Sequence, residues 1–188
     1  MTAQTEPMDA LSFELAGSRY ALPARYIREL VRAVAIDPLP SAPGVIAGVF
    51  NFRGRIVPVI ALRLRLGLAT KPLSPDDFFI IVDAPLPQRA ANDGPSGPTT
   101  WQLALLIDRP LDLVSIIPDT LANIAPSLPD SKFILGVVAT ADGVLLIQDL
   151  PAFLSHTEAA LLAHALAHAS GDSAVHDSES ARLSEGRG

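Results

Sequence analysis

Short apolar segments with two-residue alternation dominate the chain and predict β-strands. Residues 11–15 alternate apolar and polar side chains, and 20–22 follow a Gly17–Ser18 turn as the second strand of a hairpin. Further strand-like segments are separated by turn residues: 27–36, 45–52, 55–61, 78–83, 100–108, 111–117, 134–140 and 144–150. About ten short strands separated by turns predict an all-β fold of barrels or a sandwich.

One segment near the C-terminus has helical periodicity. Pro151 suits a first helical turn, and apolar side chains recur at helical spacing from Phe153 to Leu166. A break near Ser155 would let Thr157 act as a new N-cap. Residues 62–66 alternate Leu and Arg, and they fit a helical turn or a strand extension equally well.

Three segments lack the composition of a packed element. Residues 1–10 are polar, and residues 170–188 are rich in Ser, Asp, Glu and Gly with few large apolar side chains. Residues 85–98 are rich in Pro and Gly, which predicts a long loop. We therefore expect a flexible N-terminus at 1–10, one domain at 11–169 that contains this loop, and a disordered tail at 170–188.

An internal repeat relates two parts of the chain. A shift of 88 residues superimposes two segments that each contain a strand, a tight turn with Gly and a second strand. The shift places Ile46, Gly48, Val49, Ile56, Val57, Val59 and Leu62 on Ile134, Gly136, Val137, Val144, Leu145, Ile147 and Leu150. Chance similarity between apolar strands is one explanation. The other, which we favour, is two related small barrels built from one β module.

The charge is unevenly distributed along the 188 residues. The formal net charge of −6 argues against a general nucleic-acid binder. Residues 19–65 contain eight Arg against Glu29 and Asp37, so this segment carries +6 and the rest of the chain carries −12. Either the molecule presents faces of opposite sign to two partners, or the two parts interleave in space.

Several chemistries and locations are disfavoured by the composition. The absence of Cys excludes disulfides, thiolate metal sites and a thiol nucleophile. The densest apolar stretches, 78–82 and 103–107, are far shorter than the roughly 20 residues of a membrane span. Glu6 and Asp9 lie where a secretory signal requires positive charge and then an apolar core. We expect a cytoplasmic protein without membrane insertion.

Catalytic and cofactor motifs are absent from the sequence. It contains no nucleophile elbow, phosphate loop, dinucleotide fingerprint or His-Glu-x-x-His zinc motif. Asp76 and Asp77 follow Pro75 before a strand, where we expect them to cap a turn. His164 and His168 are four residues apart on the predicted helix and could share a metal, but no third ligand is evident beside them. We expect two solvated His, no metal, no cofactor and no enzymatic activity.

The segment 40–62 stands out. It reads PSAPGVIAGVFNFRGRIVPVIAL, in which Gly48 would allow close backbone approach. Asn51 and Gly54 would bracket a hairpin tip, and the tip would expose Arg53. The five fixed donors of its guanidinium suit a carboxylate on another molecule. The alternative is that Arg53 is simply a solvent-exposed turn residue that binds no partner.

This segment resembles the CheW family of chemotaxis coupling proteins, whose members carry an Ala-Pro, Ile-x-Gly-Val, Asn-x-Arg-Gly and Ile-Val-Pro-Val run. Further resemblance lies in the opening hairpin at 13–22, the strand at 27–30, the strand at 105–108 and the closing hairpin at 134–150. It covers about 11–155 in family order. The chain departs from the family at Ala61, where Asp is usual before Leu-Arg, at Ala104, where many members have Gly, and in its longer loop.

The resemblance implies two packed five-stranded SH3-like β-barrels with a C-terminal helix. It also implies a non-enzymatic adaptor that couples the cytoplasmic tip of chemoreceptors to the regulatory domain of a CheA-type histidine kinase, recruited to membrane receptor arrays. The pathway would be chemotaxis, pilus motility or another chemosensory system. The receptor-facing positions carry over as Ile27, Glu29, Gly48, Asn51, Arg53 and Gly54. A ligand-binding β-barrel, the alternative class, would need a polar-lined cavity in the shared interior.

Overall fold

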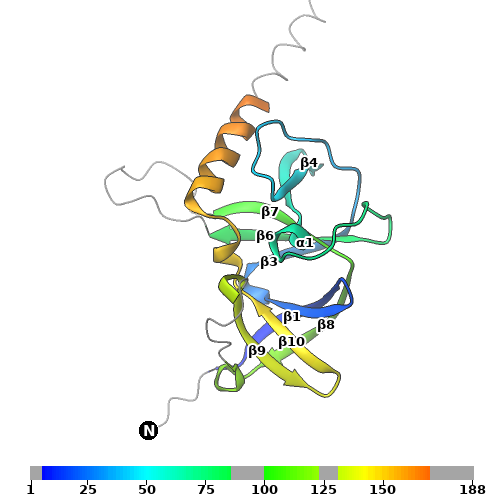
Figure 1. Ribbon diagram of the computed structural model, residues 1–188, viewed down its shortest axis with the longest axis vertical. Coiled ribbons are helices and arrows are strands. Elements are labelled where there is room, and N and C mark those ends of the chain that lie inside the picture. The colour runs from blue at the N-terminus through cyan, green and yellow to red at the C-terminus, as the bar shows by residue number, and fades with distance from the viewer. Residues whose placement is uncertain (1–5, 86–99, 123–130, 170–188) are drawn as a thin grey trace, which may run out of the picture.

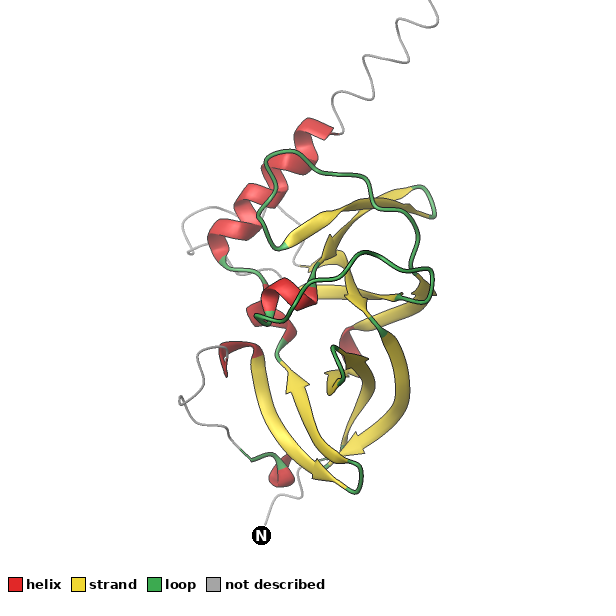
Figure 2. Ribbon diagram, turned by 45° about the vertical axis from the view of Figure 1, so that its right-hand side comes forward, coloured by secondary structure: helices red, strands yellow, loops and turns green. Residues whose placement is uncertain are grey.

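The strands of the protein form two separate five-stranded sheets (Figure 1). The computed structural model describes residues 6–85, 100–122 and 131–169. The sheet that we call the terminal barrel has the order β8 (Arg109–Ile116), β1 (Met8–Leu15), β2 (Ser18–Pro23), β10 (Gly143–Gln148) and β9 (Ile134–Thr140). The sheet that we call the central barrel has the order β3 (Ile27–Arg32), β6 (Phe78–Pro85), β7 (Thr100–Ile107), β5 (Arg55–Ile60) and β4 (Ile46–Phe52). Each sheet curls into a small SH3-like barrel (Figure 2), which confirms the expected all-β fold class.

The two barrels share one connectivity. In each, three antiparallel strands are joined by a parallel pair to a hairpin: β3–β6–β7 to β5–β4, and β8–β1–β2 to β10–β9. The central barrel uses strands that are contiguous in the chain. The terminal barrel instead combines the first two strands with the last three, so the barrels are circular permutations of one another.

The 88-residue repeat coincides with this correspondence. The bounds of β4 and β5, shifted by 88, are the bounds of β9 and β10. In both barrels the segment before the hairpin crosses its first strand through paired backbone hydrogen bonds, between Asp37 and Val49 and between Ala122 and Val137. Val49 and Val137 are themselves 88 residues apart, so the prediction of one repeated β module is confirmed.

The strand boundaries differ most from the prediction at the start of β1 and at the end of β3. β1 begins at Met8 rather than residue 11, because β8 is long enough to pair with the residues at the end of the predicted flexible segment 1–10. β3 ends at Arg32 rather than at residue 36, because the chain there leaves β6 and turns toward the Asp37 bridge. Pro85, the first residue of the predicted loop 85–98, is instead the last residue of β6, because it still pairs with Thr100. The rest of that loop and the predicted tail at 170–188 lie outside the described residues.

The largest hydrophobic core lies between the barrels rather than inside either one. It contains Phe13 and Leu22 from the terminal barrel and Ile80 and Leu105 from the central barrel, all of them fully buried. Smaller clusters fill the two barrel interiors. Burying one such side chain contributes about 1.5–3 kcal/mol, so separating the barrels would be strongly unfavourable. This apolar packing gives no support to the alternative of a polar-lined ligand cavity in the shared interior.

A helix over residues 156–169 packs against this core and follows the short 3-10 helix η4 (Leu150–Phe153). The predicted N-cap at Thr157 is wrong, since Ser155 caps the helix instead. The Ser155 Oγ accepts from the Glu158 N–H, and the Glu158 carboxylate accepts from the Ser155 N–H at 2.9 Å. No helix among the described residues is long and apolar enough to span a membrane.

The segment 62–66, whose structure the sequence left open, forms the short helix α1 (Leu62–Arg65) between the barrels (Figure 1). Leu62 is buried in the core. Ala61 occupies the N-cap and makes no side-chain capping hydrogen bond. The departure from the family pattern at Ala61 therefore leaves α1 without a cap.

We expect Ala61→Asp to raise the free energy of unfolding by about 1 kcal/mol. A carboxylate at the N-cap accepts hydrogen bonds from the free N–H groups of the first turn, and its negative charge is stabilised by the positive end of the helix dipole. Urea denaturation measures the change. Ala61→Asn is the matched control, since it supplies the acceptor without the charge. A lower stability for both variants would show that the side chain at this position has no room to cap.

The positive and negative parts of the chain interleave in space. Five Arg of the basic segment form ion pairs with acids outside it: Arg19–Asp142, Arg28–Asp83, Arg32–Asp76, Arg63–Asp108 and Arg65–Glu158. This arrangement favours the second of the two interpretations of the charge pattern, in which the parts mix rather than form two opposed faces. Among the described residues of that segment, Arg53 is instead paired within the segment itself, with Glu29.

Candidate functional site

The candidate site is the tip of the β4–β5 hairpin. Arg53 and Gly54 form its two-residue turn, and both have positive φ angles, of 53° and 82°. Positive φ at both central residues is typical of the tight turns that match the twist of paired strands. The Asn51 Oδ1 accepts from the Gly54 N–H at 2.8 Å and fixes the turn. The predicted roles of Asn51 and Gly54 in bracketing the tip are confirmed.

The tip projects the Arg53 guanidinium into solvent beside β3. The side chain is 71% exposed, and its Nη2 donates to the Glu29 Oε1 at 2.7 Å. The guanidinium also lies over the Phe52 ring, 5.0 Å from the ring centroid. Glu29 and Phe52 thus hold the arginine in place while leaving most of its surface free. The structure brings together the predicted residues Glu29, Asn51, Arg53 and Gly54.

Exposed apolar side chains adjoin this ion pair along the chain. Leu30 follows Glu29 and is exposed, and Ile56 lies three residues beyond Arg53 and is exposed as well. Successive side chains of a strand point to opposite faces, so Leu30 lies on the other face of β3 from Glu29, between Arg28 and Arg32. Leu30 and Ile56 are therefore exposed apolar side chains of the same barrel rather than established parts of the Arg53–Glu29 surface.

Gly48 is buried and does not contribute surface to the site. Its φ is +146°, and a Cβ at this position would lie 2.2 Å from the Asp37 carbonyl oxygen. The predicted close backbone approach is confirmed, and its cause is the segment that crosses β4. Gly48 therefore shapes the hairpin whose tip carries Arg53.

Ile27 lies apart from the tip, at the start of β3. It is half-buried and packs against the core between the barrels. The Asp77 carboxylate caps the turn as expected, since its Oδ2 accepts from the Ser74 N–H at 2.8 Å. Asp76 lies in the turn, but its exposed carboxylate pairs with Arg32 instead of capping. None of these three residues adds chemistry to the tip.

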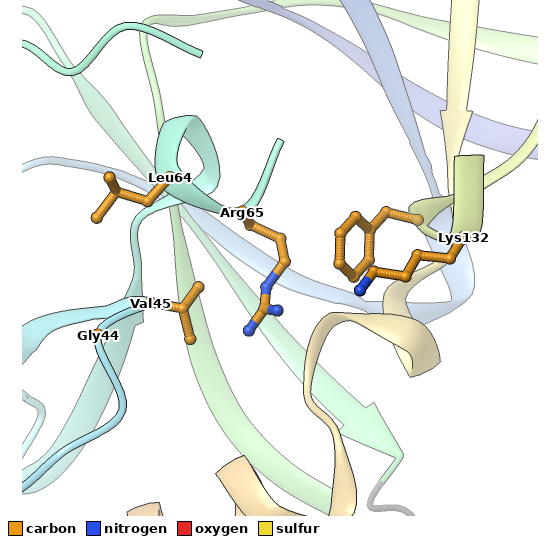
Figure 3. Close-up of a pocket in the computed structure, with 6 residues that line it drawn as sticks. Gly44, Val45, Leu64, Arg65 and Lys132 are labelled. Carbon is orange, nitrogen blue, oxygen red and sulfur yellow. The ribbon is translucent and has the colours of Figure 1, made fainter. Parts of the chain in front are cut away.

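A separate pocket of about 400 Å³ lies where α1 meets the segment before β4 and the 3-10 helix η3 (Ser131–Phe133) (Figure 3). Gly44, Val45, Leu64, Arg65, Lys132 and Phe133 line it. Its two cations have partners, because Arg65 binds Glu158 at 2.7 Å and the Lys132 Nζ lies 4.8 Å from the centroid of the Phe133 ring. The lining contains no carboxylate, imidazole or hydroxyl group that could serve as an acid–base or nucleophilic catalyst.

The comparisons with known proteins agree with this geometry. The model of the CheW-like domain matches residues 9–158, which include both barrels and the Arg53 hairpin. The chain belongs to the CheW-like domain family. The chemotaxis protein CheW of Treponema pallidum is 26% identical over 168 residues, which cover 87% of this chain and 92% of that protein.

Further relatives of this CheW-like chain include the chemotaxis protein CheW of Helicobacter pylori, 32% identical over 77 residues. That match covers 41% of this chain and 47% of the relative, so it spans about half of the Helicobacter protein. The crystal structure of the scaffolding protein TtCheW from Thermoanaerobacter tengcongensis has a TM-score of 0.66 and 26% identity, covering 81% of this chain and 97% of that one. The CheW-like fold therefore spans nearly the whole TtCheW chain.

Proposed function

We propose that this CheW-like protein is a non-enzymatic chemotaxis scaffold that couples the cytoplasmic tip of chemoreceptors to the regulatory domain of a CheA-type histidine kinase. The names of its relatives, chemotaxis protein and scaffolding protein, support this role. Such a scaffold acts through contact alone, because two moderate interfaces on one molecule raise the effective concentration of each partner near the other. The protein would carry out this role in the cytoplasm, at membrane receptor arrays.

The observation that carries the proposal is the exposed guanidinium of Arg53 on a rigid hairpin tip. Its Glu29 partner orients it without burying it, and an exposed pair of this kind is worth only about 0–1 kcal/mol to the fold itself. Arginine on a fixed turn can form a bidentate hydrogen-bonded pair with a carboxylate of a partner. We propose that the receptor contacts Arg53 and Glu29 at this hairpin tip.

We expect Arg53→Glu to weaken binding of a chemoreceptor cytoplasmic fragment from the same genome by about thirtyfold, the effect of losing one hot spot. The reversed charge would also repel Glu29. Isothermal titration with the purified full chain measures the affinity, and urea denaturation confirms that the variant is folded.

Arg109→Glu is the matched control. Arg109 is also an exposed arginine paired with a glutamate, Glu14 at 2.6 Å, but it lies in the terminal barrel. The affinity of the Arg109→Glu variant for the receptor fragment should stay within about threefold of the wild-type affinity. Equal affinity for folded Arg53→Glu and wild-type protein would overturn the assignment of the site while leaving the family and the fold intact.

A further inference from the structure

The sequence alone led us to expect two solvated His and no metal, but from the observed geometry we propose that the helix over residues 156–169 carries a binding site for a divalent transition metal, formed by His164 and His168. Both side chains are exposed and lie one turn apart on the same face of the helix. Their Nε2 atoms are 3.1 Å apart, with the ring planes tilted by 60°. This site is independent of the proposed scaffold function.

The separation of the two nitrogens is compatible with a shared metal. Zinc binds imidazole nitrogen at about 2.0–2.1 Å, so two adjacent ligands at angles between square and tetrahedral lie about 2.9–3.4 Å apart. The observed 3.1 Å falls within that interval. The helix therefore already holds the two nitrogens at a chelating distance, which lowers the cost of ordering the ligands.

The surroundings of the pair suit a cation. The helix contains no Lys or Arg, so no positive side chain of the helix opposes an incoming ion. The buried side chains Leu162 and Ala165 fix the opposite face of the helix against the protein, which keeps the two His directed outward.

The site would be open rather than enclosed. Among the described residues there is no group of three or more His, Cys, Asp or Glu that could hold a metal, so the two imidazoles would be the protein ligands and water would complete the coordination. Imidazole suits zinc, nickel and copper, and copper should bind most tightly of the three. Hard cations such as magnesium and calcium, which prefer oxygen ligands, should not bind.

Titration of the metal-free full chain with Zn²⁺, followed by calorimetry and by the NMR signals of the His ring protons, tests the proposal. We expect wild-type protein to bind one ion with shifts of both His164 and His168. His164→Ala and His168→Ala should each weaken binding on the order of a hundredfold, because each removes the chelate. Neither substitution should harm folding, since Ala favours an exposed helix.

His156→Ala is the matched control, because His156 is exposed on the same helix and has no His one turn away. It should bind zinc as tightly as the wild type. Absence of zinc uptake by the wild-type protein would overturn the proposal and leave a hydrogen bond between the two rings as the whole interaction. Equal uptake by the wild type and His164→Ala would also overturn it, because the ion would then bind elsewhere.

Discussion

Gly48→Ala should lower the free energy of unfolding by about 3–5 kcal/mol, because the change combines a clash with backbone strain. The new Cβ would lie 2.2 Å from the Asp37 carbonyl oxygen and 2.6 Å from the Ile36 Cγ2, and φ is +146°. The Asp37 carbonyl group belongs to the backbone, and Asp37 is held to Val49 by two hydrogen bonds of 2.8 Å. It therefore cannot move aside without breaking backbone hydrogen bonds. Urea denaturation measures the loss.

The repeat supplies a matched control for this substitution. Gly136 occupies the equivalent position 88 residues later, but a Cβ there would meet the Leu121 side chain at 3.0 Å, and no positive φ is required. Because that side chain can shift, Gly136→Ala should cost about 1 kcal/mol or less. Similar losses for the two variants would contradict the view that the Asp37 crossing fixes the β4–β5 hairpin.

Asp108→Ala should cost about 2–3 kcal/mol, because its carboxylate joins three parts of the molecule. Oδ2 accepts from Arg63 at 2.6 Å and from the Ala16 N–H at 2.8 Å, while Oδ1 lies 3.2 Å from the Lys71 Nζ. These groups belong to α1, the β1–β2 turn and the segment before β6. Removing the acceptor leaves the Nη2 of the largely buried Arg63 guanidinium without its counter-charge, although Nη1 still donates to the Ala69 carbonyl oxygen, and it leaves the Ala16 N–H without its acceptor.

Asp83→Ala is the control for this experiment. Asp83 also forms an ion pair with an arginine, Arg28, but that guanidinium is largely exposed. Surface pairs contribute little, so this variant should lose no more than about 1 kcal/mol. If urea denaturation gave the same loss for both variants, Asp108 would be an ordinary surface acid rather than a link between the barrels.

The same network predicts how stability depends on pH. Burial raises the pKa of Asp108, but hydrogen bonds from Arg63, the Ala16 N–H and Lys71 outweigh that effect and hold the pKa below its ordinary value of 3.8. Because the folded-state pKa is the lower one, the stabilisation is present above pH 3.8 and is lost as the pH falls through the folded-state pKa. The difference in stability between wild type and Asp108→Ala should therefore shrink in acid, whereas a constant difference would contradict this origin.

Local patterns predicted the strands and the hairpin tip because alternation and turn residues act over a few neighbours. The two-residue turn at Arg53 and Gly54 needed nothing distant to form. The helix cap was within reach too: Ser155 and Glu158 have the Ser-x-x-Glu spacing of a capping box, and choosing Thr157 overlooked the reciprocal bonds that such a pair makes.

Contacts between distant segments could not be predicted in this way. Glu29 and Arg53 were both candidate site residues, but their ion pair depends on the barrel bringing β3 beside the β4–β5 hairpin. The pairing of Arg19 with Asp142 likewise depends on the parallel contact of β2 with β10. The charge pattern along the chain therefore allowed either two opposed charged faces or interleaved charges, and the strand topology favours the interleaved arrangement.

The circular permutation of the terminal barrel constrains the order of folding during synthesis. All strands of the central barrel leave the ribosome before β8 is complete, so that barrel can fold while translation continues. The β1–β2 hairpin, although made first, lacks its parallel neighbour until β10 emerges. The β1–β2 hairpin must therefore wait for β8 and β10, and during that interval its apolar face is open to chaperones and to neighbouring chains.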